Sequence, residues 1–245
     1  MVWQALLELA DDHLVLGHRL SEWCGHAPML EEDLALPNMA LDLIGTARTL
    51  YARAGEIEGA GRDEDALAYL RGERDYRNCL LVERPNEDFA HTMLRQLYFA
   101  ALMKPYWEAA MGSSDPVVQG VAGKAVKEMA YHIRHAGEWV IRLGDGTEES
   151  AARMRDAVAA LAIYVDEMFD DSPAALAAAG VLPRRADLRG AFDATIAAVF
   201  SGAMLDQPAA PYAQRGGRDG LHSEGLGHML AVMQSLHRQH PGAVW

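Results

Sequence analysis

Apolar residues recur along most of this chain at the three- and four-residue spacing of one face of an α-helix. The first such segment runs almost from the N-terminus to about Cys24, and a Gly25–Pro28 break follows it. No segment shows the alternation of a β-strand. The pattern therefore predicts an all-α protein. The further helices are expected at about Glu31–Ala54, Asp63–Arg71, Asn86–Met111, Asp115–Leu143, Thr147–Phe169, Ser172–Gly180, Ala186–Leu205 and from Ser223 to before Pro241.

Residues that favour helix ends support several of these boundaries. Asn86 is followed by two acidic residues, which is the pattern of an N-cap with a favourably charged first turn. Asp115 precedes a proline at the first helical position, a common helix start. Gly55 is expected to end the second long helix, and Pro105 to bend the third.

Helices of this number and length predict a four-helix bundle with additional C-terminal helices, in one domain over residues 1–245. The segment Gln207–Leu221 is rich in Gly, Pro and Arg and is expected to be a long ordered loop. The longest apolar run, Val158–Val165, is too short to span a bilayer.

The composition narrows the possible partners. The formal net charge is −13, so a nucleic acid or an anionic membrane would be repelled, and neither is expected as a partner. Two cysteines, Cys24 and Cys79, are too few for a disulfide scaffold and are typical of free thiols in a reducing compartment. Acidic residues interrupt the N-terminal apolar segment, which is unlike a secretory leader. A cytoplasmic protein is expected.

The segment Leu41–Arg48 has the frame of a metal-binding helix without its ligands. Carboxylate-bridged di-iron bundles take a lone Glu from each of two helices and a Glu-x-x-His pair from each of the other two. A typical ligand helix reads Glu-x-Gly-His-Ala-Arg, and Leu43 and Thr46 stand here in the Glu and His slots. This helix is expected to supply no metal ligand.

Two antiparallel helices can be aligned by counting residues outward in both directions from the centre of the turn that joins them. For the first two helices we take this centre near Pro28. It places Asp12 opposite Ile44, so Asp11 or Asp12 would stand at the level of a lone ligand carboxylate. The alternative is that these carboxylates are solvated, and we expect this for at least one of them.

The fourth helix is the best source of ligands, because Glu128 and His132 lie on one helix face. Their spacing is i,i+4 instead of i,i+3. Reflection through Ser114 places them opposite the window Arg95–Tyr98, which holds no carboxylate. A bundle with so few ligands should not assemble a di-iron centre.

Two interpretations of Glu128 and His132 remain open. In one, Glu128 pairs with Lys124 or Arg48, and His132 is hydrogen-bonded within a polar layer. In the other, the chain is a metal-dependent oxygenase or oxidase in its own right, with a reduced site around Glu128 and His132. This second site would also use Asp11 or Asp12.

Two further motifs give weak signals. The Arg215–Gly220 loop resembles a phosphate-binding loop in composition only, because it lacks the P-loop spacing and the Lys-Ser/Thr pair. It leaves open a third and weaker possibility, a regulatory CoA-ester binder that uses the Arg215–Arg218 loop. His222, Glu224 and His228 lie around the start of the last helix, where helix capping and partner contacts explain them better than catalysis.

Four stretches together resemble the C subunits of bacterial multicomponent phenylacetyl-CoA epoxidases, and the resemblance covers essentially the whole chain. They are Leu14–Arg48, Leu80–Gln96, Lys124–Gly146 and Arg215–Gln234. The resemblance implies a ferritin-like subunit of phenylacetate catabolism that lacks a di-iron centre, carries no catalytic residue and supports a homologous A subunit that holds the metal. It also implies a B subunit and a flavin/iron–sulfur reductase that uses NADPH, in a system that epoxidises the aromatic ring with O₂.

Overall fold

The computed structural model describes residues 1–206 and 210–243. Within these ranges the chain is all-α, as predicted, and it contains no strand. The helices are α1 (Val2–Ser21), α2 (Leu30–Glu58), α3 (Glu64–Tyr69), α4 (Leu80–Glu83), α5 (Phe89–Ala110), α6 (Pro116–Gly144), α7 (Glu148–Val165), α8 (Pro173–Ala177), α9 (Arg189–Gly202), α10 (Glu224–Met233) and α11 (Ser235–Gln239). Four short 3₁₀ turns connect them: η1 (Glu73–Asp75), η2 (Asp166–Phe169), η3 (Arg185–Leu188) and η4 (Gly217–Asp219).

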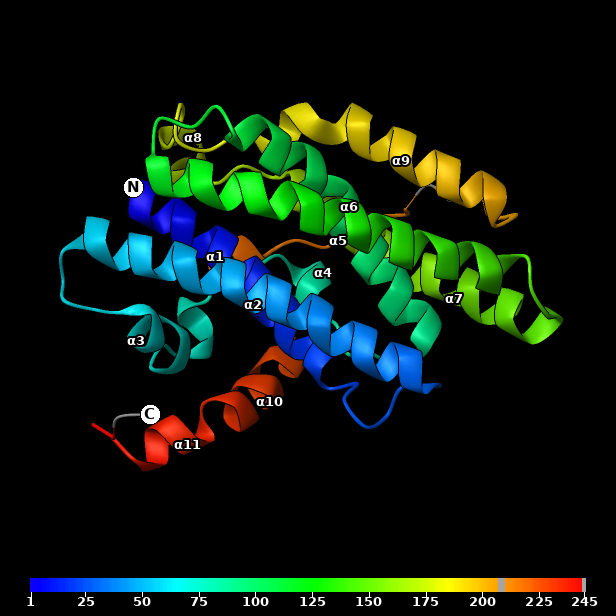
Figure 1. Cartoon of the computed structure of the whole chain (residues 1–245), viewed down its shortest axis with the longest axis horizontal. Helices are drawn as coiled ribbons and strands as arrows, with labels where there is room; N and C mark the ends of the chain where they lie inside the picture. Colours follow the sequence, from blue (N-terminus) through cyan, green and yellow to red (C-terminus); the bar gives the residue numbers. More distant parts are fainter. Residues whose placement is uncertain (207–209, 244–245) are drawn as a thin grey trace.

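Helices α1, α2, α5 and α6 form the ferritin-like four-helix bundle, and the other helices surround it (Figure 1). Helix α1 pairs with α2, α5 pairs with α6, and α2 also contacts α6. Helices α7 and α9 pack against the α5–α6 pair, while α10 and α11 lie on the opposite side of the bundle. The bundle with additional C-terminal helices is therefore confirmed, and the single domain over residues 1–245 stays a prediction.

Helix α1 is buried on almost every side. From Ala5 to Leu20, every residue except His18 is buried, because α2, α4 and α8 all pack around this helix. A helix buried all round is normally apolar all round. Here the buried residues include four charged side chains, namely Glu8, Asp11, Asp12 and Arg19. Each of them needs a partner inside the protein.

The predicted start of α6 is confirmed, and the end of α2 lies later in the chain than predicted. The Asp115 side chain caps α6, and Pro37 and Pro105 lie inside α2 and α5. Helix α2 continues past Gly55 to Glu58, and Gly59 caps it in a left-handed conformation. A Cβ at Gly55 would lie 2.1 Å from the carbonyl oxygen of Arg62, so this glycine permits a close chain approach.

The predicted N-cap at Asn86 is wrong. Helix α5 begins at Phe89, and the side chain of Asp88 accepts the capping hydrogen bond from the His91 amide. The Asn86 amide group instead donates to the carbonyl of Arg19 on α1. The Asn side chain has both donors and acceptors, so it can cap a helix or bridge two chain segments. For Asn86, the contact with α1 determines which of these roles it takes.

The C-terminal half is more broken than predicted. Helix α7 tightens into η2 near its end, α8 stops at Ala177, and the last helix is divided into α10 and α11 at Gln234. Of the predicted loop Gln207–Leu221, residues 207–209 lie outside the described ranges, and the rest is irregular apart from η4. Among the described residues, no helix combines the length and apolar character needed to cross a membrane.

We predict that His13 makes the stability of this fold depend on pH. Burial lowers its pKa to about 4, while its Nδ1–H group donates to the Leu9 carbonyl and its ring packs edge-on against Phe99 and Trp107. An unfolded histidine titrates near pH 6.5, so protons bind the unfolded state first as pH falls from about 6.5 to 4. The free energy of unfolding should fall by about 3 kcal/mol over this window because of His13.

Urea unfolding at several pH values tests this prediction. The variant His13→Phe should lose this part of the pH dependence, while His26→Gln, at an exposed position, should keep it. Identical pH profiles for the wild type and His13→Phe would contradict it.

Candidate functional site

The two residues in the empty ligand slots of α2 face the protein interior. Leu43 is fully buried and Thr46 is only 5 % exposed. They therefore occupy the inward positions that a metal-binding helix would give to Glu and His. An aliphatic side chain and a hydroxyl group fill this space with no charge at all.

The predicted register of α1 against α2 is wrong. Ile44 packs against Gly17, where an added Cβ would lie 2.8 Å from the Ile44 side chain, and Tyr51 pairs with Asp11. These contacts centre the register near Leu30 and not near Pro28. Turns and bends extend over residues 22–29 before α2 begins. Asp12 therefore lies more than one helical turn away from the level of Leu43.

The expectation that Asp11 or Asp12 is solvated is also wrong. Asp11 is fully buried, and its Oδ2 accepts hydrogen bonds from Arg71 Nη1 at 3.0 Å and from the Arg77 amide at 2.8 Å. Its Oδ1 accepts from the Tyr51 hydroxyl at 2.5 Å and from Arg71 Nη2. The carboxylate is thus saturated by charged and neutral donors.

Asp12 forms an equivalent lock with the C-terminal part of the chain. It is 3 % exposed, and Arg218 binds it in a bidentate manner, with Nη1 at 2.9 Å and Nη2 at 2.8 Å. The Cys79 amide donates to the same carboxylate at 2.8 Å. Two neighbouring carboxylates on α1 thus fix two segments that are remote in sequence, one around Arg71 and one around Arg218.

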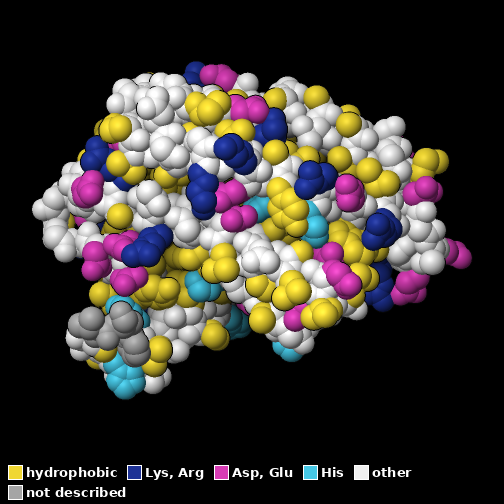
Figure 2. Space-filling view, in the orientation of Figure 1, with side chains coloured by type: hydrophobic (Ala, Val, Ile, Leu, Met, Phe, Trp, Pro, Cys, Tyr) yellow, Lys and Arg dark blue, Asp and Glu magenta, His cyan; other side chains and the backbone are white. Residues whose placement is uncertain are grey.

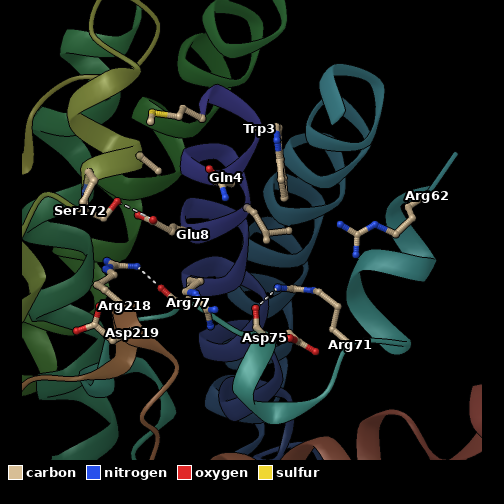
Figure 3. A pocket seen from close by; sticks show the side chains of 14 residues that line it. Trp3, Gln4, Glu8, Arg62, Arg71, Asp75, Arg77, Ser172, Arg218 and Asp219 are labelled. Carbon is tan, nitrogen blue, oxygen red and sulfur yellow. Dashed lines mark hydrogen bonds between the residues drawn. The ribbon is translucent and has the colours of Figure 1, made fainter. Parts of the chain in front are cut away.

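A polar cavity of about 490 Å³ opens beside these locks, near the N-terminal part of α1. Figure 3 shows Arg218, Glu8 and Ser172 on one side of it and Arg71 and Arg62 on the other. The Ser172 hydroxyl donates to Glu8 at 2.6 Å. Burial raises the pKa of Glu8, while Arg218 and Arg185 lower it to a smaller extent. Arg71, Arg218, Arg62 and Glu8, which line this cavity, are thus all bound to other side chains of the protein.

The polar layer between α5 and α6 agrees with the predicted reflection through Ser114. Gln96 Nε2 lies 3.0 Å from His132 Nδ1, and His132 Nε2 lies 3.2 Å from Asp42 Oδ2 on α2. His132 is fully buried, so these contacts satisfy both ring nitrogens. The interpretation of His132 as a hydrogen-bonded core histidine is confirmed.

Glu128 is bound by a lysine, as one of the two interpretations predicts. Lys124 Nζ lies 2.6 Å from Glu128 Oε1, whereas Arg48 pairs with Glu64. Burial raises the pKa of Glu128, and the hydrogen bond from His132 lowers the pKa of Asp42. Asp12 does not contact Glu128, His132 or Asp42; it binds Arg218 instead. Among the described residues, no group of three or more His, Cys, Asp or Glu side chains is arranged to hold a metal ion.

The Arg215–Gly220 loop has its backbone donors occupied by a carboxylate of the protein itself. The amides of Gly216 and Gly217 donate to Glu167 Oε1 at 2.7 and 2.8 Å, and the Leu80 amide donates to Oε2 at 2.6 Å. Arg215 binds Asp170, and Arg218 binds Asp12. Glu167 therefore fills the place that a phosphate would need, which removes the physical basis of the CoA-ester hypothesis.

His222 is a structural link and not part of a metal site. Its Nδ1 lies 2.7 Å from Glu83 Oε2 and its Nε2 lies 3.0 Å from the Tyr76 carbonyl. Burial lowers the pKa of His222, but the hydrogen bond and charge of Glu83 outweigh burial, and the net pKa is raised. Glu224 and His228 are exposed and stand 3.8 Å apart, away from Glu83.

Sequence patterns missed the buried acids Glu8, Glu83 and Glu167. Glu8 carried a usable signal, because it interrupts the run Leu6-Leu7-Glu8-Leu9-Ala10 at a position that must be buried. Glu83 and Glu167 carried none, since each belongs to a short or irregular segment whose packing comes from distant residues.

The chain has clear relatives among known proteins. A family model described as phenylacetic acid catabolic protein matches residues 1–245. The C subunit of the 1,2-phenylacetyl-CoA epoxidase of Escherichia coli (strain K12) is 44% identical over 241 residues, which cover 98% of this chain and 97% of that relative.

The Asp12–Arg218 lock is expected to contribute strongly to stability. The variant Arg218→Met leaves a carboxylate buried without its charged partner and should reduce the free energy of unfolding by about 3–5 kcal/mol. The double variant Asp12→Leu/Arg218→Met removes both charges and should recover most of this loss. Arg215→Met is the matched control, because Arg215 is half-exposed, and it should cost less than about 1 kcal/mol. A similar loss in Arg218→Met and Arg215→Met, measured by urea unfolding, would refute the lock.

Restoring ligands at the empty slots should destabilise the protein. The variant Leu43→Glu/Thr46→His buries polar groups that have neither a metal nor hydrogen-bond partners, so thermal unfolding should show a loss of several kcal/mol, on the order of 3. Leu41→Glu, at a position that is 66 % exposed on the same helix, should change the stability by less than about 0.5 kcal/mol. Equal melting temperatures for all three proteins would show that the inward slots are wrongly assigned.

Proposed function

Because this chain belongs to the family of phenylacetic acid catabolic proteins, we propose that it is the C subunit of a 1,2-phenylacetyl-CoA epoxidase and catalyses no step itself. Its role is to brace a homologous A subunit, which holds the di-iron centre. A small B subunit and a reductase with flavin and an iron–sulfur cluster, supplied by NADPH, complete the cytoplasmic assembly.

One observation carries this proposal, namely that the carboxylates that the bundle could direct at a metal are bound by arginine or lysine side chains of the chain itself. A di-iron bundle needs four carboxylates and two histidines directed at one level. On α1, Asp11 and Asp12 lie more than one helical turn from the level of Leu43, and their oxygens accept hydrogen bonds from Arg71 and Arg218. Helix α2 offers Leu43, and α5 offers the neutral Gln96. The residues present do not fit a di-iron centre.

The same contacts suit a bracing role. Each arginine lock attaches a distant segment to the central helix α1. Glu83 accepts a hydrogen bond from the Ser223 amide, and Glu167 joins the Arg215–Gly220 loop to the Leu80 amide. Bidentate pairs of this kind fix orientation as well as distance. A bundle tied internally in this way offers a rigid surface, while its partner keeps the open interior that substrate and oxygen require.

Reconstitution tests the proposal. We expect the iron-loaded A subunit with this chain to form a stable complex that, with the B subunit and the reductase, epoxidises phenylacetyl-CoA. This chain alone should be inactive. The variant Glu128→Gln should support activity within about twofold of the wild type, because Glu128 makes a structural contact only.

Two outcomes would overturn the proposal. One is epoxidation or oxidase activity by this chain without the A subunit. The other is a loss of about a hundredfold or more in Glu128→Gln with the complex intact, which would indicate a catalytic site around Glu128 and His132.

A further inference from the structure

Helix α2 exposes a row of leucines to solvent. Leu30, Leu34 and Leu41 are 70, 60 and 66 % exposed. Their spacing of four and seven residues places them on one face of the helix, opposite the face that packs on α1. Single exposed leucines are ordinary on protein surfaces, whereas several on one helix face favour contact with another molecule.

The neighbouring helix α6 exposes a row of cations around a tyrosine. Lys127, Tyr131 and Arg134 are spaced by four and three residues, and all three are exposed. The Arg134 guanidinium lies 5.5 Å from the centre of the Tyr131 ring. Within the described residues, neither Lys127 nor Arg134 has a carboxylate partner. We call Leu30, Leu34, Leu41, Lys127, Tyr131 and Arg134 together the α2–α6 face.

These unpaired cations stand out against the composition of the chain. It has 35 acidic residues and only 22 Lys and Arg residues, so carboxylates are abundant. Three of its residues are lysines, and two of these, Lys124 and Lys127, lie on α6. A cation that stays unpaired on so acidic a protein is available to a carboxylate of another molecule.

Contacts between the two helices bring the rows together. His132 of α6 lies 3.2 Å from Asp42 of α2, and His135 Nε2 lies 2.9 Å from Glu32 Oε2. The helices run side by side on the face directed at the viewer in Figure 1. Figure 2 shows Lys and Arg side chains across the middle of this face, with hydrophobic, acidic and histidine side chains among them.

A groove continues the face toward the start of α6. Gly45, Thr46, Gly120 and Lys124 line a cavity of about 280 Å³ between α2 and α6. A Cβ added at Gly120 would have no neighbour within 4 Å, so the floor of the groove is open to an incoming side chain. Small residues of this kind allow another helix to approach closely.

We infer that the α2–α6 face is the surface on which this chain docks its catalytic partner, the A subunit. This inference rests on the proposed function. The partner surface must present apolar side chains opposite the leucine row and carboxylates opposite Lys127 and Arg134. A second copy of this chain fits less well, because a twofold axis at Tyr131 brings Lys127 of each copy toward Arg134 of the other and leaves these cations unpaired.

Binding measurements on the full-length chain with the A subunit test the inference. The double charge reversal Lys127→Glu/Arg134→Glu should weaken the complex by about tenfold or more and remove most of its salt dependence. The variant Leu34→Asp/Leu41→Asp should weaken it by about a hundredfold. Arg155→Glu, an exposed and unpaired cation on α7, and Val232→Asp, an exposed apolar residue on α10, are the matched controls. Both should bind within about twofold of the wild type.

The possible results separate the inference from the proposed function. If the wild type does not bind the A subunit, the proposed function fails. If the wild type binds and the face variants bind equally well, with unchanged melting temperatures, only the docking surface is wrong. If the isolated chain dimerises and the face variants make it monomeric without weakening its binding to the A subunit, the face joins two copies and the inference is overturned.

Discussion

The pairing of buried aspartates with arginines from distant segments is the interaction on which the rest of the structure depends. Helix α1 is surrounded on nearly all sides, yet it carries Asp11 and Asp12 in its middle. Such carboxylates are tolerable only with charged partners, and the chain supplies Arg71 and Arg218. The positions of the segment around α3 and of the Arg215–Gly220 loop follow from this requirement.

The same requirement explains the chemistry that the bundle does not support. A carboxylate has about four lone-pair sites. Asp11 accepts four hydrogen bonds and Asp12 accepts three, so little capacity is left for a metal. At the α2–α6 seam, His132 uses one nitrogen for Gln96 and the other for Asp42, while Glu128 binds Lys124. Ligand-type residues are thus present, but each is engaged in holding helices together. An interior tied in this way suits a protein that supports a catalytic partner.

Sequence patterns predicted the parts of the structure that depend on local spacing. The helix periodicity, the Asp115 cap and the reflection of α5 on α6 were correct because the α5–α6 turn is short and its centre is defined by Asp115 and Pro116. The predicted register of α1 against α2 was wrong because the longer connection before Leu30 has no comparable marker of its centre.

The burial of Asp11 and Asp12 could not be predicted, since their partners lie about 60 and 206 residues away in sequence. Leu43 and Thr46 face inward, as expected for the Glu and His slots of the Glu-x-Gly-His-Ala-Arg pattern, because that comparison depends on local spacing within one helix.

The central claim is that the ligand-type side chains of this bundle are bound to other residues of the chain and leave no place for iron. Iron analysis of the purified A–C assembly, loaded with excess iron and then freed of loosely bound metal, tests this claim most directly. The account predicts two irons per A–C pair, with none remaining on this chain once the two proteins are separated. Four irons per pair, or two that stay with this chain, would contradict it.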